Sequence, residues 1–282
     1  MSRIEEALKK AASHRSTSVS PSEGTVQKEI VTNQREPEVS LSKAEQFSNL
    51  VNVSSIKVDH LMLATARDDK SEVVEEYNKL RSTVIALTKG EQFLNTLMVT
   101  STISEEGKSM TALNLAISLA KEHDHTVLLV DTDLRRPSVH RFLGIKPEVG
   151  LVHCLRDGLP IEKALVKTGI GKLVVLPAGE AITDPVDMLA SNRMKEIILE
   201  LKERYAERYV IFDTPPAMPF ADAGVLAANM DATLFVAREG RARKQDVIKT
   251  VSEFKNHNLL GVIYNDAHAF TKKHNYYYYY SR

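Results

Sequence analysis

The sequence predicts an α/β protein whose mostly parallel sheet is covered by helices on both faces. Short runs of aliphatic and β-branched residues alternate with amphipathic helical stretches along most of the 282-residue chain. These runs are apolar throughout, as is typical of strands that are buried on both faces of a parallel sheet. Apolar residues make up 43% of the chain, which is enough to bury a sizeable core.

Residues 1–58 differ from the rest of the chain in composition. Ser2 and Glu5 have the spacing of a capping box, so a short helix that could dock on a partner is expected in residues 1–15. A frayed terminus without a partner is the alternative. Residues 16–58 are rich in Ser, Thr, Glu, Asn and Gln and poor in large apolar side chains, which predicts a flexible linker.

The folded domain is expected in residues 59–270, and periodicity predicts its elements. An edge strand is expected at 60–63, and apolar residues at helical spacing predict a helix on the core within residues 73–87. Six further apolar runs predict the remaining strands, at 97–99, 126–130, 173–176, 209–212, 233–236 and 259–263.

The chain ends in a tyrosine-rich tail, residues 271–282. Tyrosine occurs 9 times in the sequence, and more than half of these residues stand in succession at Tyr276–Tyr280. Such a run next to a nucleotide-binding domain suggests a phosphorylation substrate within the chain. A sticky segment of low complexity is the alternative.

Charge and cysteine content narrow the range of partners and compartments. Lys+Arg and Asp+Glu both number 37, so no overall field attracts nucleic acid, and no nucleic-acid partner is expected. A single cysteine, Cys154, cannot close an intramolecular disulfide, and no apolar signal region or run of about 18 apolar residues is present. A cytoplasmic location is therefore expected.

A phosphate-binding loop is predicted after the strand at 97–99. Backbone N–H groups at the start of the next helix bind phosphate oxygens, Lys108 neutralises the β and γ phosphates, and Ser109 offers its hydroxyl to Mg²⁺. Thr102 stands where such loops usually have their first glycine, and an ordinary strand-to-helix turn is the alternative. The residues expected to bind ATP are Ser104, Glu105, Glu106, Gly107, Lys108, Ser109 and Met110.

Carboxylates follow two of the predicted strands. Asp131 and Asp133 come after the strand at 126–130, and Asp213 comes after the strand at 209–212. Open α/β sheets bind ligands at the carboxyl ends of their strands, and Mg²⁺ prefers oxygen ligands. Each aspartate alone could instead cap a helix or a turn. The expected metal ligands, directly or through water, are Ser109, Asp131 and Asp213.

Together these segments resemble the bacterial tyrosine kinases, the autokinases of polysaccharide biosynthesis that use Walker motifs. Walker A is matched by residues 101–109, the second Walker-type motif by 127–137, Walker B by 210–216, and the terminal tyrosine cluster by 276–280. The resemblance covers about residues 59–282. It implies a P-loop NTPase-like fold with ATP and Mg²⁺ as cofactors.

The resemblance also implies roles for single residues. Lys108 and Ser109 are expected to hold phosphate and metal, and Asp131 is a candidate acceptor of the tyrosine proton. The residues implied to be catalytic are Lys108, Asp131, Asp133 and Asp213. The autophosphorylation sites implied are Tyr276, Tyr277, Tyr278, Tyr279 and Tyr280.

The same resemblance implies a process and partners. The chain is similar to the stand-alone cytoplasmic autokinases that regulate exopolysaccharide or capsule polymerisation or export. Their expected partners are a membrane chain-length-determinant protein (co-polymerase) that activates the kinase and a tyrosine phosphatase that opposes it. A location at the inner face of the plasma membrane, through that partner, is expected.

Self-assembly into a ring is a further implication. The family's Glu-x-x-Arg-x-x-Arg segment corresponds here to Glu75, Asn78 and Arg81, so the first arginine is replaced. Glu75 and Arg81 are the expected oligomerisation residues. A solvated face of an amphipathic helix is the alternative.

Two other functions remain open from the sequence. A ParA/MinD-type positioning ATPase carries a signature lysine where this chain has Ile103, and a non-catalytic nucleotide-binding adaptor is compatible with Thr102 and Asn78. Several basic side chains are also candidates for binding phosphate or an acidic tail of an activator. They are Arg135, Arg136, Arg238, Arg241 and Arg243, with a surface role as the alternative for the last two. His140 and His153 are expected to be surface or satisfied polar groups.

Overall fold

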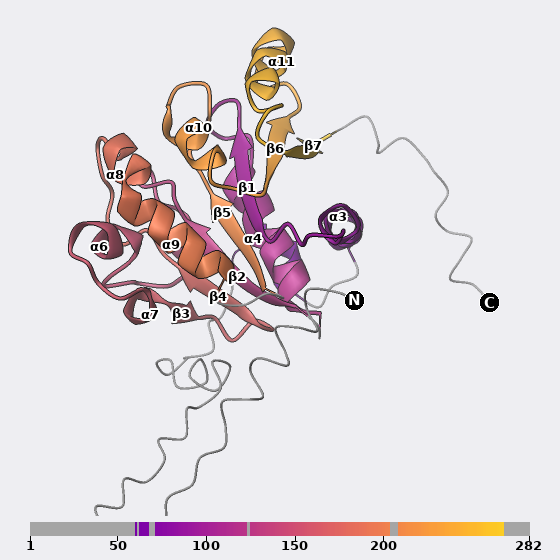
Figure 1. Ribbon diagram of the computed structural model, residues 1–282. Coiled ribbons are helices and arrows are strands. Elements are labelled where there is room, and N and C mark those ends of the chain that lie inside the picture. The colour runs from indigo at the N-terminus through magenta and orange to yellow at the C-terminus, as the bar shows by residue number, and fades with distance from the viewer. Residues whose placement is uncertain (1–59, 61, 68–70, 123–124, 204–207, 268–282) are drawn as a thin grey trace, which may run out of the picture. The chain divides into compact units, whose positions relative to one another are not determined.

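The computed structural model describes residues 60, 62–67, 71–122, 125–203 and 208–267, which form a sheet flanked by helices (Figure 1). The sheet has the strand order β3-β4-β2-β5-β1-β6-β7. Neighbouring strands run parallel, except that β3 is antiparallel to β4. The predicted fold class is confirmed. The strands are β1 (Thr96–Ser101), β2 (Thr126–Asp131), β3 (Val166–Lys167), β4 (Leu173–Leu176), β5 (Arg208–Asp213), β6 (Ala232–Arg238) and β7 (Leu259–Asn265).

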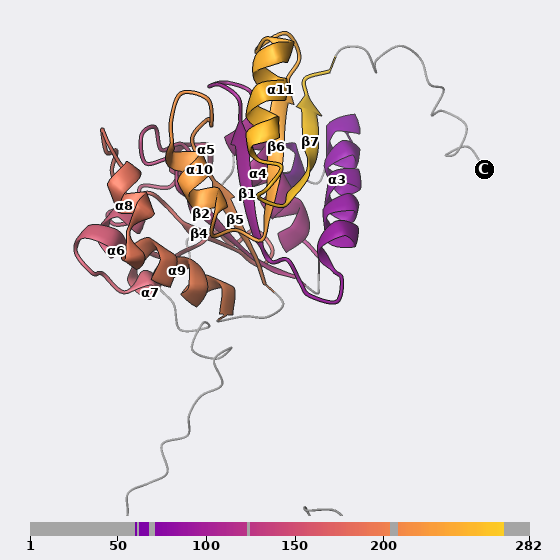
Figure 2. The ribbon, with the colours of Figure 1, turned by 45° about the horizontal axis from the view of Figure 1, so that its top comes forward.

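Alternate residues of the central strands face two separate cores. In β2, Leu128 and Val130 belong to the core that includes α9 and α10, whereas Val127 and Leu129 belong to the core that includes α4. All of these side chains are fully buried, so both faces of the strand are covered (Figure 2). This double coverage explains why the strands are apolar throughout.

The helices divide between the same two cores. The first core contains α6 (Leu151–Arg156), α7 (Ile161–Ala164), α8 (Val186–Ala190), α9 (Asn192–Glu203), α10 (Asp222–Ala227) and α11 (Lys244–Glu253). The second contains the 3-10 helix η1 (Ala64–Ala66) and the helices α3 (Glu72–Thr88), α4 (Lys108–Ala120) and α5 (Val139–Phe142).

Helix α4 is buried on nearly all sides because other helical segments cover the face that the sheet leaves open. Of its 13 residues, all but Met110 are buried. Helix α3, which confirms the helix predicted within residues 73–87, lies beside α4 (Figure 2). Only Val84 and Thr88 of α3 are buried, whereas Val73 and Leu87 are about half exposed (51% and 53%). The helix therefore covers mainly α4, and its last residue, Thr88, reaches the sheet through a 2.7 Å hydrogen bond with the Tyr209 hydroxyl.

The edge strand expected at 60–63 is wrong. The described residues there form a turn that leads into η1, and Leu63 is fully buried in the core around α4. The side chain of Asn114 in α4 satisfies this segment: its Oδ1 accepts the Thr65 N–H (3.1 Å), and its Nδ2 donates to the Met62 carbonyl (3.1 Å). Backbone groups that a neighbouring strand could have paired thus bind one helix side chain.

Gly150 allows the start of α6 to lie directly on the segment after β4. The N–H groups of Leu151 and Val152 donate to the carbonyls of Pro177 (2.8 Å) and Ala178 (3.0 Å). A β-carbon on Gly150 would lie 2.3 Å from both the Pro177 oxygen and the Gly179 nitrogen. Because these are backbone atoms, Gly150→Ala should lower the free energy of unfolding by about 1–3 kcal/mol, measured by urea denaturation.

Gly224, on α10, is the matched control for that substitution. A β-carbon there would meet nothing within 4 Å. Gly224→Ala is therefore expected to raise stability by up to about 1 kcal/mol through helix propensity. Equal effects of the two substitutions would contradict the packing argument at Gly150.

Candidate functional site

The phosphate loop connects β1 to α4, as predicted. Strand β1 ends at Ser101, and α4 begins at Lys108 with Gly107 as its N-cap residue at φ 92°. A β-carbon on Gly107 would lie 2.2 Å from Nδ2 of Asn265. Both the left-handed backbone and this close contact therefore require glycine.

Thr102 replaces the usual first glycine of the loop without backbone strain. Within the loop, Glu105 (φ 66°) is the non-glycine residue with a positive φ, and Thr102 is not. Thr102 is fully buried, and its carbonyl accepts the Met218 N–H at 3.1 Å. A side chain at this position is compatible with the fold of the loop.

Glu106 supports the loop from within the protein. It is fully buried, and its Oε2 accepts the Ile103 N–H at 2.8 Å. Burial raises the pKa of the Glu106 carboxyl, although the backbone donors oppose that shift. Nδ2 of Asn265 donates to the Glu106 carbonyl at 2.9 Å. Glu106 is therefore expected to meet a nucleotide through its backbone N–H.

The tip of the loop is held by arginines that follow β6 or end it. Arg241 forms an ion pair with the Glu105 carboxylate, and its Nε donates to the Ser104 carbonyl at 3.5 Å. Arg238 donates to the Glu105 carbonyl at 3.4 Å. In this structure both arginines therefore support the loop that is expected to bind phosphate.

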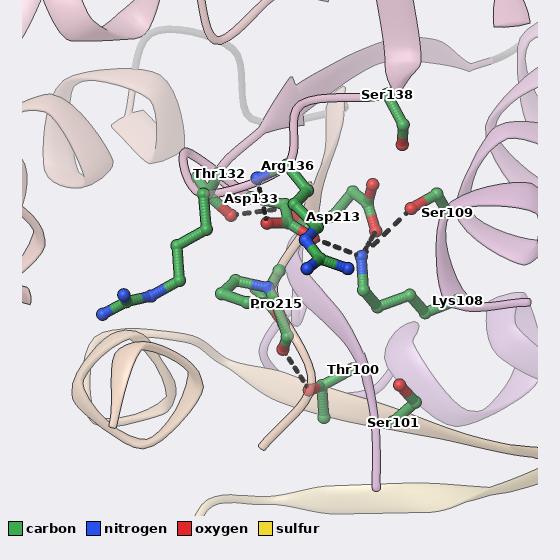
Figure 3. Close-up of polar contacts among 12 residues, drawn as sticks. Thr100, Ser101, Lys108, Ser109, Thr132, Asp133, Arg136, Ser138, Asp213 and Pro215 are labelled. Carbon is green, nitrogen blue, oxygen red and sulfur yellow. Dashed lines mark hydrogen bonds and ion pairs between the residues drawn. The ribbon is translucent and has the colours of Figure 1, made fainter. Parts of the chain in front are cut away.

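Lys108 lies between the carboxylates that follow β2 and β5 (Figure 3). Its Nζ is 2.7 Å from Oδ2 of Asp133 and 3.6 Å from Oδ1 of Asp213, and it donates to the Ser109 hydroxyl at 3.1 Å. Burial alone lowers the pKa of this ammonium, but the charges of Asp213 and Asp133 outweigh it and raise the pKa. Lys108 therefore stays charged within the protein.

Asp213 is buried, and the Lys108 ammonium at 3.6 Å offsets its charge. Neither of its carboxylate oxygens has a hydrogen-bond partner among the described residues, and the side chain is fully buried. Burial raises the pKa of this carboxyl, and the Lys108 charge opposes the rise. Acceptors without donors beside a phosphate loop are suited to bind a hydrated cation.

The Asp131 carboxylate accepts hydrogen bonds from the backbone around it. Its Oδ1 accepts the Asp133 N–H (3.2 Å), and its Oδ2 accepts the N–H groups of Ser138 and Val139 (3.1 Å each). Burial and the nearby Asp213 carboxylate raise the pKa of Asp131 to about 8, whereas the Val139 N–H favours the charged form. With both oxygens engaged, Asp131 orders the segment between β2 and α5.

Asp133 links that segment to the phosphate loop. Its Oδ1 accepts the Arg136 N–H at 3.0 Å, and its Oδ2 binds Lys108. Asp133 and Asp213, which follow two different strands, thus meet at one lysine.

The donor set fits Mg²⁺ in part. Ser109 and Asp213 present oxygen atoms beside Lys108, whereas both oxygens of Asp131 are taken by backbone donors. No three His, Cys, Asp or Glu side chains of the described residues could hold a metal ion by themselves. Mg²⁺ in proteins commonly keeps several waters and takes further ligands from phosphate. Met110 packs its side chain on the core of α4, which leaves its backbone for the nucleotide.

The predicted oligomerisation residues lie on α3 in different environments. Glu75 is exposed. Arg81 pairs with Glu122 of its own chain (Nε to Oε1, 3.0 Å) and donates to the Ser118 carbonyl at 3.2 Å. Oδ1 of Asn78 accepts the Ser118 hydroxyl at 3.3 Å. Contact of Arg81 with a second subunit stays a prediction.

Sequence reasoning missed Asn265 and the partners of Arg81. Asn265 ends β7 at the same edge of the sheet as the aspartates, so the strand-end rule could have found it. Nothing local in the sequence pairs Arg81 with Glu122. The tyrosines Tyr276–Tyr280, the expected helix at 1–15 and the expected linker at 16–58 lie outside the described residues.

Comparison with known proteins places the site among characterised relatives. The AAA domain family matches residues 99–259, which contain the phosphate loop and the strand-end aspartates. The tyrosine-protein kinase YwqD of Bacillus subtilis is 34% identical over 215 residues, which are 76% of this chain and 88% of that protein. Several other tyrosine kinases are much longer, and the chain spans 24–30% of their length.

Solved structures show the same relationship. The kinase domain of the Escherichia coli tyrosine kinase ETK has a TM-score of 0.64 and 28% identity, over 76% of this chain and 80% of that one. The septum site-determining protein MinD of Pyrococcus horikoshii, complexed with Mg-ADP, has a TM-score of 0.51 and 22% identity, over 60% of this chain and 69% of that one. The second likeness is one of fold alone.

Proposed function

The chain belongs to the bacterial tyrosine kinases, and we propose that it transfers the γ-phosphoryl group of ATP to its own tyrosines Tyr276–Tyr280. The observation that carries the proposal is the position of Lys108, held 2.7 Å from Asp133 and 3.6 Å from Asp213 at the end of the phosphate loop. The terminal tyrosine run supplies an acceptor in the same chain.

The proposed reaction is an in-line transfer. The phenolic oxygen of a tyrosine forms a bond to the γ-phosphorus, the bond from that phosphorus to the β–γ bridging oxygen breaks, and ADP leaves with the electron pair. Little covalent chemistry falls to the protein, so catalysis rests on positioning and on charge. Lys108 neutralises charge on the β and γ phosphates, for which it leaves Asp133.

Mg²⁺, when bound, neutralises phosphate charge and aligns the leaving group. Ser109 and Asp213 are the residues proposed to hold it, with Asp213 acting directly or through water. Asp131 supports that site from behind by ordering the Asp133 and Ser138 N–H groups. Its proposed role is therefore one of positioning.

Asp133 is the proposed acceptor of the phenolic proton. Its Oδ2 is the oxygen that Lys108 occupies, so movement of Lys108 to the phosphates leaves that oxygen free. Asp131 has no comparable free oxygen, because backbone donors occupy both. The phenol, with a pKa near 10 in water, need not lose its proton early in a loose transition state.

We further propose that this kinase regulates exopolysaccharide or capsule polymerisation or export. The family relationship supports a membrane co-polymerase as activating partner, assembly with copies of itself, and a tyrosine phosphatase as opponent. Among the described helices, none combines the length and apolarity needed to cross a bilayer. Attachment to the inner face of the plasma membrane is therefore proposed to depend on that partner.

One experiment separates this function from the alternatives. The full chain is incubated with Mg-ATP, and phosphotyrosine is mapped by mass spectrometry, with a variant carrying phenylalanine at 276–280 alongside. Phosphate confined to the tail and absent from the variant is expected. ATP hydrolysis without phosphotyrosine would instead indicate a positioning ATPase, and neither activity would indicate an adaptor.

A further inference from the structure

A basic pocket is lined in part by residues that follow Asp133, the aspartate that binds Lys108. It has a volume of ≈ 460 Å³, within the usual range of ligand pockets. Its lining comes from the segment between β2 and α5, from α5 itself and from the segment after β4. The lining includes Arg135, Arg136, His140 and Arg141 with Gly179 and Ala181.

Of the three arginines that line this pocket, one is paired with a carboxylate and two are not. Arg135 binds the fully buried Asp222 (Nε to Oδ2, 2.6 Å) and lies over the Phe220 ring at 4.3 Å, so it forms a fixed wall. Arg136 and Arg141 are exposed, and neither side chain has an ion pair or hydrogen bond with any described residue. The pocket therefore holds positive charge that its own walls do not offset.

His140 lines the same pocket, and one nitrogen of its ring is buried. Its Nδ1 is buried without a hydrogen-bond partner among the residues described, although the sequence predicted a surface or satisfied group. Burial, with the charge of Arg141, lowers the pKa of His140, so the ring is neutral near pH 7. By contrast, His153 accepts the Gly150 N–H at 3.2 Å, as expected for a satisfied group.

The pocket and the phosphate loop site share a connection through Asp133. The backbone N–H of Arg136 donates to Oδ1 of Asp133, whose Oδ2 binds Lys108. Figure 3 shows the Arg136 side chain extending on the same side of the segment as Asp213 and Lys108. The backbone of Arg136, which lines the pocket, is thus linked to Lys108 through one aspartate.

We propose that this pocket binds the phosphate of an already phosphorylated tyrosine while a neighbouring tyrosine of the same segment enters the phosphate loop site. The inference rests on the proposed function. Arginine side chains match phosphate oxygens bidentately, and two unpaired ones suit a dianionic aryl phosphate.

The tyrosine run can serve two sites that lie roughly 7–10 Å apart. An extended chain advances roughly 3.3 Å per residue, so a phosphotyrosine two or three positions away lies roughly 7–10 Å from the accepting tyrosine. The run Tyr276–Tyr280 places every acceptor within that reach of another tyrosine. The first phosphate would therefore promote the next transfers on the same tail.

Binding of a phosphopeptide without nucleotide tests the pocket independently of kinase activity. The probe is a fluorescent peptide of residues 271–282 with phosphate on Tyr278, and the protein is the full chain with phenylalanine at 276–280. Fluorescence anisotropy should show at least tenfold tighter binding of this peptide than of its unphosphorylated form. The double substitution Arg136→Gln, Arg141→Gln should weaken binding of the phosphopeptide about ten- to hundredfold.

Two controls define the site. Arg243→Gln removes an exposed arginine that does not line the pocket, and Lys108→Met removes the charge of the phosphate loop. Both variants should retain tight binding of the phosphopeptide. Inorganic phosphate should displace the peptide only at much higher concentration than phenyl phosphate does.

Specific results overturn the inference. Equal affinity for the two peptides, loss of binding in Lys108→Met alone, or equal competition by inorganic and phenyl phosphate would each do so. A chain that makes no phosphotyrosine yet binds the phosphopeptide through Arg136 and Arg141 would refute the proposed function and leave the pocket assigned.

Discussion

Replacement of Lys108 by methionine is expected to lower autophosphorylation by at least about 10²-fold, measured as phosphotyrosine formed per minute in Mg-ATP. A preorganised charge that stabilises a phosphoryl transition state typically contributes that much. Methionine has similar length and no charge, so the space that Lys108 fills on α4 stays filled. Undiminished phosphotyrosine in this variant would refute the role of Lys108.

The same substitution has an expected effect on stability that depends on pH. Without the ammonium, the pKa of Asp213, already raised by burial and held back by Lys108, rises further. A carboxyl with a raised pKa in the folded state binds more protons folded than unfolded, so stability falls as pH rises above about 4. Urea denaturation at pH 5 and pH 8 should therefore show a larger loss in Lys108→Met than in the unmodified protein.

Lys108→Arg is the matched control for that effect. It retains a positive charge near Asp133 and Asp213 but cannot reproduce the compact ammonium of lysine at the phosphates. The variant should lose phosphoryl transfer and keep a pH dependence of stability close to that of the unmodified protein. A large pH effect in both variants would mean that Lys108 does not control the charge of Asp213.

The sheet was predictable because burial on both faces leaves a strong mark on sequence. Each of the central strands matches an apolar run, whereas the order of the strands in the sheet was not predicted. Two-residue β3 and the four-residue helices α5 and α7 are too short for any period to register. The segment at 60–63 is apolar in the same way as a strand, but its neighbour is a helix, and the Asn114 side chain that satisfies it is distant in sequence.

The sequence predicted where the charged residues of the site lie, but not what each of them does. Strand ends and the Gly107-Lys108 turn place the charged groups, because parallel strands deliver their carboxyl ends to one edge. Which aspartate is satisfied depends on the path of the chain after β2, where Ser138 and Val139 turn back to Asp131. Asp131 and Asp213, which both end a strand, therefore lie in different hydrogen-bonding environments.

Replacement of Asp213 by asparagine is expected to lower phosphoryl transfer by at least about 10²-fold without lowering stability at neutral pH. Both oxygens of Asp213 are buried without hydrogen-bond donors, and burial raises the pKa of its carboxyl. The negative charge of Asp213 is therefore unfavourable for the folded protein. When that charge is removed, Lys108 keeps its 2.7 Å contact with Asp133. Because the raised pKa makes stability fall as pH rises, Asp213→Asn should show a smaller loss between pH 5 and pH 8 than the unmodified protein.

Asp131→Asn separates this effect from a general one of removing a buried carboxylate. Asparagine has a single acceptor oxygen, so at least one of the N–H groups of Asp133, Ser138 and Val139 loses its partner. That loss should cost about 1–3 kcal/mol of unfolding free energy in urea denaturation. If Asp213→Asn destabilises the protein as much as Asp131→Asn, or keeps full activity, Asp213 is a structural acceptor. If Asp131→Asn destabilises the protein while Asp213→Asn is stable but inactive, the charge of Asp213 contributes to catalysis and lowers the stability of the fold.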